Sequence, residues 1–573
     1  MSNYKELYDK WLNSSVLTDE ERKQLVDIAN NEEEKEDRFY KELEFGTAGL
    51  RGKVGMGSNR MNRFIIARAT KALAKTIIDN GLQDKGIAIA HDPRLFSKEF
   101  AKLAALVMAS NGVKAYLFED LRPTPELSFT IRYLKTASGI NITASHNPKE
   151  YNGYKVYWQE GSQIKSNISD KVLEYINSMD IFDNYVTLTE EEAVKKGLLV
   201  YIGKEIDEKF YKESLDCAIN DDNIDKGISV VYTPLNGAGY KAVTTVLARR
   251  GFNNVYVVEE QKDPDGTFPT IEYPNPEDTA AFEYGERLAK KVDADILIAT
   301  DPDCDRLAVE VVHDGEIISF NGNQTGAVLV QYVIENLAKQ GKLPKNPALV
   351  KSIVTSKMVE PLCNEYGVEV IDVLTGFKNI CALPNEWDTT GEKNYIMGYE
   401  ESIGYNVGTF LRDKDGVTIA MLLVEAAAFY KKQGKTLVDV LDEFYKKYGY
   451  YLDKTISIVL EGASGAKRIK RMMEQYREIF AREIAGSKVA VVTDYLTQKE
   501  KTVATGEEKD ITIEKTDAVK FSYDDESWYT LRPSGTEPKI KLYIYVKADD
   551  KSVAEEKLVK FEEKVLELLY SIK

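Results

Sequence analysis

Apolar residues recur at helical spacing in several stretches of the chain, and short apolar runs lie between these stretches. Residues 63–80 carry apolar side chains three and four positions apart, and Gly81 follows as a helix stop. The run 86–90 predicts a strand, Ser97 is placed to cap the next apolar helix, and residues 114–118 predict another strand. This alternation of helix and strand predicts an α/β domain.

The alternation returns twice further along the chain. Residues 228–232 predict a strand followed by a helix beyond Gly239, and residues 348–354, 360–366 and 368–373 predict strand, helix and strand. The repeated units predict three similar α/β domains with mixed, largely parallel sheets. The boundaries that we expect for them are residues 1–205, 206–318 and 319–445.

The last part of the chain has a different pattern. Residues 456–459 and 489–492 predict strands, and Ser552 with Glu555 forms the sequence of a capping box for the last helix. This pattern predicts a smaller α+β domain over residues 446–573.

Length and composition fit such a multidomain protein. The chain has 573 residues, enough for about three to five domains. Its composition, with 43% hydrophobic and 29% charged residues, is typical of a soluble globular protein. Lys and Arg number 76 against 93 Asp and Glu, and the net charge of −17 argues against a nucleic-acid partner. Any anionic ligand must therefore meet local positive charge.

The sequence also bears on the cellular compartment. Four cysteines, Cys217, Cys304, Cys363 and Cys381, lie far apart, without the paired spacing of a zinc site. Residues 1–20 lack the apolar core of a signal peptide, and no stretch approaches the ~18 apolar residues of a membrane span. We therefore expect a cytoplasmic protein with reduced thiols and no membrane partner.

A serine follows one of the predicted strands. Residues 139–143 predict the strand, and residues 144–148 form a turn that ends at a proline. Ligands of open α/β sheets gather at the carboxyl ends of strands, so the Ser145 hydroxyl, next to His146 and ten residues before Lys155, is a candidate nucleophile. The alternative is a capped turn without chemistry.

Three aspartates follow another strand. Residues 295–300 predict a buried strand, and Asp301, Asp303 and Asp305 alternate directly after it. Alternate positions of an extended loop can face the same side, and a magnesium ion takes a few carboxylates while leaving positions for phosphate oxygens. The alternative is a solvated acidic turn, although three such carboxylates repel one another without a cation.

Two further loops offer groups suited to a sugar. Residues 400–404, Glu-Glu-Ser-Ile-Gly, follow the strand-like residues 395–399 and combine acceptors with a hydroxyl donor. Taken alone, a glutamate pair beside a loop is more often a solvated face. The nearby residues 412–416 contain cations that could meet an anionic ligand, and they are equally ambiguous.

A fourth motif near the end of the chain has the chemistry of a phosphate cradle. Residues 531–538 combine Arg532 with two hydroxyl groups and a glycine. Arginine offers two parallel donors to phosphate oxygens, and backbone amides add donors without charge. The alternative is an ordinary turn with incidental hydroxyls.

In this order, the four motifs resemble those of the α-D-phosphohexomutase superfamily, which includes phosphoglucomutases and phosphomannomutases. The likeness spans nearly the whole chain. The matching segments are residues 143–148 for the phosphoserine loop, 301–306 for the metal loop, 398–404 for the sugar-recognition loop and 532–536 for the phosphate loop. The resemblance implies four domains around a deep central cleft, each contributing one loop.

The resemblance also implies residue roles. Residues 45–52 are similar to the family's N-terminal signature, whose arginine reaches the catalytic phosphate. The implied catalytic residues are Ser145, His146, Lys155 and Arg51, and the implied ligands of one Mg²⁺ ion are Ser145, Asp301, Asp303 and Asp305. The implied substrate-binding residues are Glu400, Ser402, Thr375, Gly376, Lys414 and Arg306, and the phosphate-binding residues are Arg532, Ser534, Gly535 and Thr536.

Other segments narrow the resemblance to one branch. Residues 152–155, 265–269 and 375–378 are similar to the branch that holds bacterial phosphoglucomutases and animal phosphopentomutases. Pro302 and Cys304 depart from other branches, which have glycine at both positions. Neither change affects the three carboxylates, and we expect Cys304 to be a small buried apolar residue.

The resemblance implies interconversion of α-D-glucose 1-phosphate and glucose 6-phosphate through a phosphoserine, with glucose 1,6-bisphosphate as intermediate and activator. Phosphopentomutase or phosphomannomutase activity is the alternative with the same chemistry. Two other classes stay open: an aspartyl-phosphate phosphatase or phosphotransferase that uses Asp301, and a non-catalytic phosphosugar-binding protein. Of the possible oligomeric states, we expect a monomer.

Overall fold

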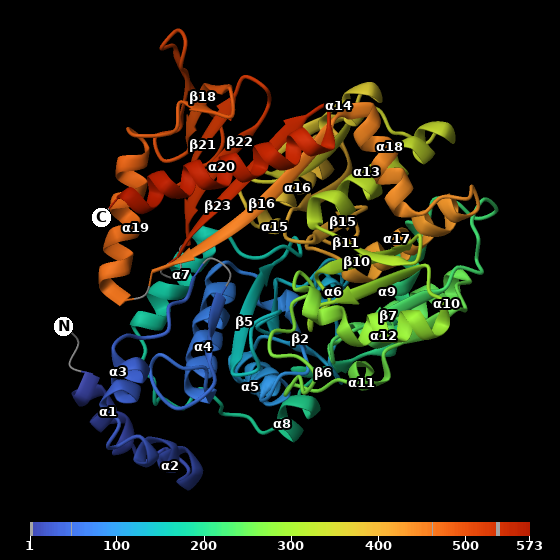
Figure 1. The fold of residues 1–573 in the computed structure, drawn as a ribbon. Helices are drawn as coiled ribbons and strands as arrows, with labels where there is room; N and C mark the ends of the chain where they lie inside the picture. The colour runs from blue at the N-terminus through green and yellow to red at the C-terminus, as the bar shows by residue number, and fades with distance from the viewer. Residues whose placement is uncertain (1–3, 47–48, 461, 535–538, 573) are drawn as a thin grey trace.

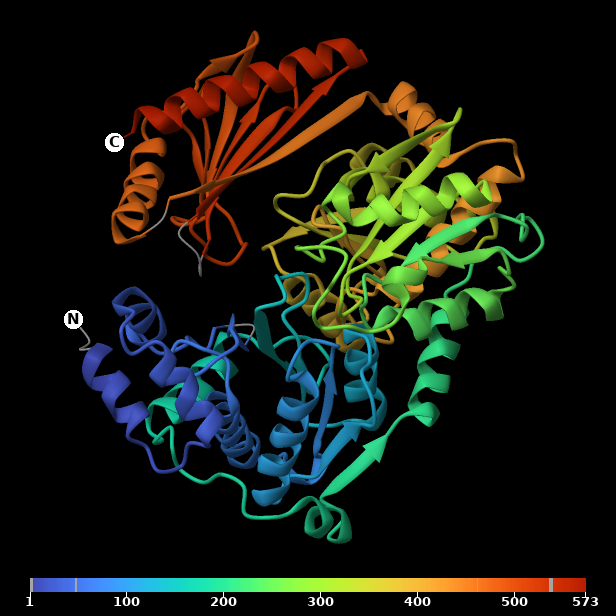
Figure 2. The same cartoon turned by 60° about the horizontal axis from the view of Figure 1, so that its bottom comes forward.

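Four domains, each built on its own sheet, follow one another along the chain (Figure 1). The computed structural model describes residues 4–46, 49–460, 462–534 and 539–572. In Figure 2 the blue N-terminal domain lies below, the green and yellow domains lie to the right, and the red C-terminal domain lies above. The first three sheets are mixed and the fourth is antiparallel, which confirms the expected fold class.

The first domain has a sheet of strand order β1-β5-β4-β2-β3-β6. Its inner strands pair in parallel, and β5 pairs antiparallel with both β4 and β1. Its elements are α1 (Tyr4–Leu12), α2 (Asp19–Asp27), α3 (Glu32–Phe39), β1 (Gly49–Lys53), α4 (Arg63–Asp79), η1 (Gln83–Lys85), β2 (Ile87–His91), α5 (Ser97–Ser110), β3 (Ala115–Phe118), α6 (Thr124–Leu134), β4 (Ser138–Ile142), β5 (Tyr151–Trp158), α7 (Ser166–Asn177), α8 (Glu190–Lys195) and β6 (Leu199–Ile202).

The second domain has the order β11-β10-β9-β7-β8, with β7 parallel to β8 and β9 and the other pairs antiparallel. Its elements are α9 (Lys204–Asp216), β7 (Val230–Thr233), α10 (Gly239–Arg250), β8 (Val255–Val257), α11 (Glu259–Lys262), η2 (Thr279–Phe282), α12 (Glu283–Val292), β9 (Ile296–Thr300), β10 (Leu307–His313) and β11 (Glu316–Phe320). The carboxyl end of β9 leads directly into the loop that contains Asp301, Asp303 and Asp305.

The third domain has the order β13-β12-β14-β15, in which β12 is parallel to both neighbours and β15 is antiparallel to β14. Its elements are α13 (Gly322–Lys339), β12 (Pro347–Ser352), α14 (Glu360–Glu365), β13 (Glu369–Val373), α15 (Phe377–Ile380), α16 (Ala382–Thr390), β14 (Asn394–Glu400), β15 (Gly404–Val407), α17 (Gly416–Lys431) and α18 (Leu437–Tyr448).

The fourth domain has an antiparallel sheet of order β16-β23-β22-β21-β18-β19-β20, with β17 beside β18. Its elements are β16 (Tyr450–Val459), α19 (Gly462–Tyr476), β17 (Glu483–Ile484), β18 (Ser487–Asp494), β19 (Lys499–Thr502), β20 (Glu508–Asp510), β21 (Val519–Tyr523), β22 (Trp528–Pro533), β23 (Lys539–Ala548) and α20 (Lys551–Ser571). The long helix α20 crosses this sheet (Figure 1).

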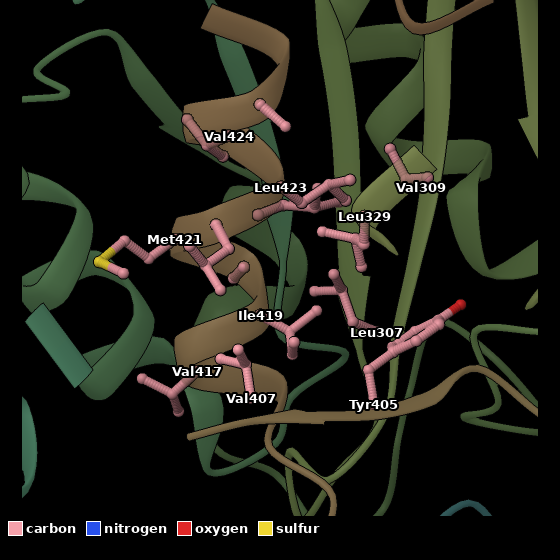
Figure 3. Close-up of a cluster of buried hydrophobic side chains, with 14 of the residues drawn as sticks. Leu307, Val309, Leu329, Tyr405, Val407, Val417, Ile419, Met421, Leu423 and Val424 are labelled. Atoms are coloured by element: carbon pink, nitrogen blue, oxygen red, sulfur yellow. The ribbon is translucent and has the colours of Figure 1, made fainter. Parts of the chain in front are cut away.

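One apolar core runs through the second and third domains. Helix α17 is buried along nearly its whole length and packs between the sheets of these domains. Figure 3 shows its side chains against residues of β10, α13 and β15. The labelled residues are Leu307, Val309, Leu329, Tyr405, Val407, Val417, Ile419, Met421, Leu423 and Val424. The second and third domains are therefore joined by a shared apolar core as well as by the chain that connects them.

Two predicted helix caps are wrong. Ser97 is the first residue of α5, and its hydroxyl donates to Asp92 at 2.8 Å instead of capping the helix. The last helix is capped by Asp550, which accepts the amides of Ser552 and Val553. Asp550 thus makes the capping interaction expected of Ser552, whereas α5 begins without a side-chain cap.

Two other expectations concern the cysteines and the membrane. The four cysteines are unpaired, and Cys304 is fully buried, as expected of a small apolar residue. Among the described residues, no helix has both the length and the apolar character needed to span a bilayer.

Candidate active site

Ser145 lies in a tight turn directly after β4. Its φ of 51° is in the left-handed region, and its amide donates to the Thr143 hydroxyl at 2.8 Å. The side chain is buried, and its Oγ donates to Asp301 Oδ2 at 2.7 Å. The structure therefore brings together two motifs that are 156 residues apart, from the first and second domains.

The three aspartates form a single buried cluster. One carboxylate oxygen from each of Asp301, Asp303 and Asp305 lies within 4.8 Å of the others. Burial and repulsion from the other two aspartates raise the pKa of Asp301 well above its ordinary value. A cation in this cluster would relieve that repulsion.

The donor set of the cluster fits a divalent cation. Asp301 Oδ1 accepts the amides of Asp305 at 3.1 Å and Arg306 at 3.0 Å. By contrast, Asp303 Oδ1 and Asp305 Oδ1 are buried and have no hydrogen-bond partner within the described part of the chain. Buried acceptors without donors are costly, and hard carboxylate oxygens are the ligands that Mg²⁺ takes. The cluster can therefore hold a metal ion.

Two lysines from other domains approach the same cluster. Lys155 Nζ, from β5, donates to Asp303 Oδ2 at 2.6 Å and to Asp305 Oδ2 at 3.2 Å. Lys414 Nζ, from the loop before α17, lies 3.1 Å from Asp305 Oδ2. Burial lowers the pKa of Lys155, but Asp303 and Asp305 outweigh burial and raise that pKa above its ordinary value. Three domains thus contribute charges to one site.

His146 and two arginines surround the serine turn. His146 Nδ1 lies 3.2 Å from Ser145 Oγ, and burial, reinforced by Arg306 and Arg51, lowers the pKa of His146 well below its ordinary value. Arg51 donates to the Asn147 side chain at 2.9 Å. The Arg306 guanidinium lies 3.2 Å from a carboxylate oxygen of Glu277.

The predicted sugar-binding residues gather at the end of β14. Glu400 Oε1 accepts the amide of Gly376 at 2.6 Å, so the segment with Thr375 lies against the glutamate. Ser402 is half-buried in the turn between β14 and β15. Glu401 instead accepts the hydroxyls of Ser352 and Thr355 at 3.1 and 3.0 Å. The two neighbouring glutamates therefore have different surroundings.

The described part of the phosphate motif lies at the carboxyl end of β22. Arg532 is half-buried and pairs with Lys541 across the two strands, and the Ser534 amide donates to the Lys539 carbonyl at 2.8 Å. Burial raises the pKa of Tyr543, Glu401 adds to this rise and Arg532 opposes it, so this edge of the fourth domain faces the sugar loop of the third. Gly535 and Thr536 lie outside the described residues.

Sequence reasoning missed some residues at this site. Thr124, the first residue of α6, donates its hydroxyl to Asp303 Oδ2 at 2.7 Å and its amide to the Asp303 carbonyl at 2.8 Å. Asp413 accepts the Tyr157 hydroxyl at 2.8 Å and lies 3.5 Å from Lys414 Nζ. The only sequence signal was position: Thr124 follows a predicted strand and stands between two prolines, and Asp413 lies within residues 412–416.

Comparison with family models identifies all four domains. The matches are phosphoglucomutase/phosphomannomutase alpha/beta/alpha domain I over residues 42–181, domain II over 209–315, domain III over 321–448 and the C-terminal domain over 484–561. The chain belongs to the phosphoglucomutase/phosphomannomutase family of enzymes, which are phosphotransferases of the isomerase class. This membership favours the mutase interpretation over an aspartyl-phosphate enzyme or a non-catalytic binding protein.

Relatives of known name agree with this membership. A phosphoglucomutase of Staphylococcus saprophyticus is 37% identical over 520 residues, which cover 91% of this chain and 93% of the relative. A phosphoglucomutase of Staphylococcus epidermidis is 37% identical over 537 residues, 93% of this chain and 96% of the relative.

Two solved structures share the fold. A putative phosphomannomutase of Thermus thermophilus has a TM-score of 0.68 at 20% identity, covering 92% of this chain and 99% of that one. The open form of the phosphoglucomutase parafusin from Paramecium has a TM-score of 0.67 at 16% identity, covering 92% and 95%.

Proposed function

We propose that this chain is a phosphoglucomutase that interconverts α-D-glucose 1-phosphate and glucose 6-phosphate through a phosphate on Ser145. The observation that carries the proposal is the 2.7 Å contact between Ser145 Oγ and Asp301, inside a buried cluster of three aspartates. Relatives named phosphoglucomutase at 37% identity support glucose as the sugar.

The proposed metal is one Mg²⁺ ion held by Asp301, Asp303, Asp305 and the Ser145 phosphate. When bound, it would neutralise phosphate charge and polarise the phosphoryl group. The two carboxylate oxygens without donors support this assignment.

Substrate would bind with its own phosphate at Arg532, Ser534, Gly535 and Thr536, and with ring hydroxyls at Glu400 and Ser402. In our proposal Thr375 and Gly376 support Glu400, while Lys414 and Arg306 supply further positive charge. The amide contact between Gly376 and Glu400 and the half-buried position of Arg532 support this arrangement. The fork of an arginine donates two parallel bonds to a phosphate.

In the first transfer, the bond between Ser145 Oγ and phosphorus breaks, and a bond forms between phosphorus and the 6-oxygen of glucose 1-phosphate. The proton of the 6-hydroxyl moves to a general base and then to the serine oxygen. Lys155 and His146 are the two candidate bases, and family resemblance favours Lys155. Arg51 would bind the transferred phosphate through its guanidinium.

Glucose 1,6-bisphosphate would then turn within the site and return the phosphate on carbon 1 to Ser145. In this second transfer the bond between phosphorus and the 1-oxygen breaks, and the bond between Ser145 Oγ and phosphorus forms again. The serine proton passes through the general base to the 1-oxygen, which leaves glucose 6-phosphate. Enclosure by the fourth domain would keep water from the phosphoserine, a role suggested by the family fold.

Ser145→Ala tests the proposal. We expect the variant to lose mutase activity by about 1000-fold or more, because no group replaces the hydroxyl. The exposed Ser166→Ala variant is the matched control and should retain activity. Intact-mass and peptide analysis of the wild type should place the phosphate on Ser145. Full turnover by Ser145→Ala, or phosphate on Asp301, would contradict the chemistry.

Substrate choice needs a separate measurement. Relative kcat/KM values for glucose, mannose and ribose 1-phosphates should be highest for glucose. A tenfold preference for ribose 1-phosphate would reject glucose as the substrate and leave the phosphoserine chemistry intact.

The remaining expectations are also proposals. We place the domain limits near residues 205, 318 and 445, which fall in α9, β11 and α18, close to the connections between the four sheets. We also propose a monomer in the cytoplasm, in keeping with the unpaired cysteines. Light scattering during size-exclusion chromatography would measure the oligomeric state.

A further inference from the structure

Arg94 lies against the Ser145 turn, in a position that the proposed reaction does not explain. It follows β2, and its side chain is fully buried. The guanidinium donates to the backbone carbonyls of Ser145 at 2.5 Å, Asn147, Pro148 at 2.8 Å and Tyr151 at 3.0 Å. One side chain therefore binds acceptors along the whole turn that carries the serine.

The turn held by Arg94 has an uncommon conformation. The φ of 51° at Ser145 is unusual for a residue other than glycine. Asp92 in turn holds Arg94, since its Oδ2 lies 3.2 Å from Arg94 Nε and its Oδ1 accepts the Arg94 amide at 2.9 Å. A buried ion pair thus supports the backbone that presents the candidate nucleophile.

The second domain contacts Arg94 through residues 265–268. Gly266 forms a β-bridge with Arg94, and a Cβ at this glycine would lie 2.5 Å from the carbonyl oxygen of Pro93. The ring of Phe268 lies 5.0 Å from the Arg94 guanidinium, within the range of a cation–π contact. Only a glycine allows the backbones to come this close, so the segment closes over Arg94 from the neighbouring domain.

The same segment is tied to the loop of the three aspartates. The Asp265 amide donates to the Asn236 carbonyl at 3.0 Å. Two residues after Asn236, the Ala238 amide donates to the Pro302 carbonyl of the metal loop at 2.8 Å. Gly237 lies so near the metal loop that a Cβ added to it would be 2.6 Å from the Pro302 Cα. A continuous series of contacts therefore joins the metal loop to the turn of the nucleophile.

We propose that Arg94 and residues 265–268 form an interdomain clamp that fixes the Ser145 turn against the metal loop, with Arg94 as a positioning residue. The inference rests on the proposed function, because it takes Ser145 as the nucleophile. A displacement of about 1 Å between reacting groups can lower a rate about 100-fold. Loosening the clamp should therefore lower kcat more than it changes substrate binding, which uses other loops.

Three variants test the clamp. Gly266→Ala and Phe268→Leu disturb it from the second domain, and Arg94→Lys keeps the charge but loses the planar fork. For each we expect kcat to fall about tenfold or more, with KM for glucose 1-phosphate within about threefold of wild type. Phosphorylation of Ser145 by glucose 1,6-bisphosphate, followed by intact mass, should slow by a similar factor. Amide hydrogen exchange of residues 143–151 should become faster.

Gly285→Ala in α12 is the matched control, since a Cβ there would make ordinary contacts at 3.6 Å or more. A merely structural role predicts a lower Tm with wild-type kcat and wild-type exchange of the serine turn. That result in folded Gly266→Ala and Phe268→Leu proteins would overturn the clamp, and these two variants decide the question if Arg94→Lys does not fold. An active Ser145→Ala variant would instead reject the proposed function.

Discussion

At the scale of single residues, donors from the protein occupy some aspartate oxygens and leave others open. Backbone amides take Asp301 Oδ1, and Thr124 with Lys155 takes Asp303 Oδ2. The buried oxygens Asp303 Oδ1 and Asp305 Oδ1 receive no donor from the described residues. For Asp303 and Asp305, the donors to one oxygen thereby fix the orientation of the carboxylate, and its second oxygen stays available to a cation.

Thr124→Val should weaken metal binding. Valine has the shape of threonine but lacks the hydroxyl that donates to Asp303 Oδ2 at 2.7 Å. Loss of such a partner of a metal ligand typically lowers affinity about tenfold. Calorimetric titration with Mg²⁺, or titration with Mn²⁺ followed by electron paramagnetic resonance, would measure the change without relying on activity. Thr124→Ser keeps the hydroxyl and should bind metal normally, and equal affinity of Thr124→Val and wild type would contradict this role.

Sequence reasoning identified the residues of this site that come directly after predicted strands. Ser145 and the three aspartates stand in short motifs at strand ends, so local order was sufficient to propose them. Thr124 could not be assigned in this way, because its contact with Asp303 spans 179 residues. Ser97 is a different case, because its hydroxyl was expected to cap a helix and instead binds the nearby Asp92.

At the scale of elements, periodicity located helices and strands better than it described their arrangement. Residues 63–80 correspond closely to α4, and residues 114–118 to β3. The antiparallel pairing of β5 with β1 could not be derived, because these two strands lie far apart in the chain. Pattern within a segment is local information, whereas strand order is not.

Leu423→Ala should destabilise the joint core of the second and third domains. Leu423 in α17 is fully buried among apolar side chains from other elements (Figure 3). Removing a buried leucine side chain costs about 2 to 5 kcal/mol through lost burial and the cavity left behind. Urea unfolding followed by hydrogen exchange of α17 would measure this loss.

The half-exposed Val559→Ala in α20 is the comparison for that variant. We expect its unfolding to differ from wild type by about 0.5 kcal/mol or less. A Leu423→Ala protein as stable as Val559→Ala would mean that α17 does not hold the two domains together.

At the scale of the whole molecule, the fourth domain meets the third through a small apolar cluster. Ile353 and Val354, just after β12, pack with Trp528 and Tyr545 of the C-terminal sheet. Lys520 of β21 lies within this contact, where its Nζ donates to the Ile353 carbonyl at 3.2 Å and lies 3.8 Å from the Trp528 ring centroid. A lysine is thus buried where the two domains join.

The buried position of Lys520 predicts that the stability of this contact depends on pH. Burial lowers the pKa of Lys520 to about 7, with Lys357 and Lys351 adding to the shift and Asp372 and Glu360 opposing it. Because the unfolded chain has the ordinary pKa of 10.5, it binds more protons than the folded protein between about pH 7 and 10.5. The stability of the wild type relative to a Lys520→Met variant should therefore rise with pH in this window.

Lys520→Met should lose that pH dependence, because methionine fills a similar volume without a charge. The difference in unfolding free energy between wild type and variant should change by up to about 1.4 kcal/mol per pH unit, in favour of the wild type as pH rises. Denaturant unfolding monitored by hydrogen exchange of the C-terminal sheet at pH 7, 8 and 9 would measure the difference. The exposed Lys515→Met variant should show a constant difference. If the difference in unfolding free energy for Lys520→Met is also constant with pH, Lys520 stays charged at the contact, where Trp528 and the Ile353 carbonyl stabilise it. Proton release from Lys520 would then not govern how the fourth domain is attached.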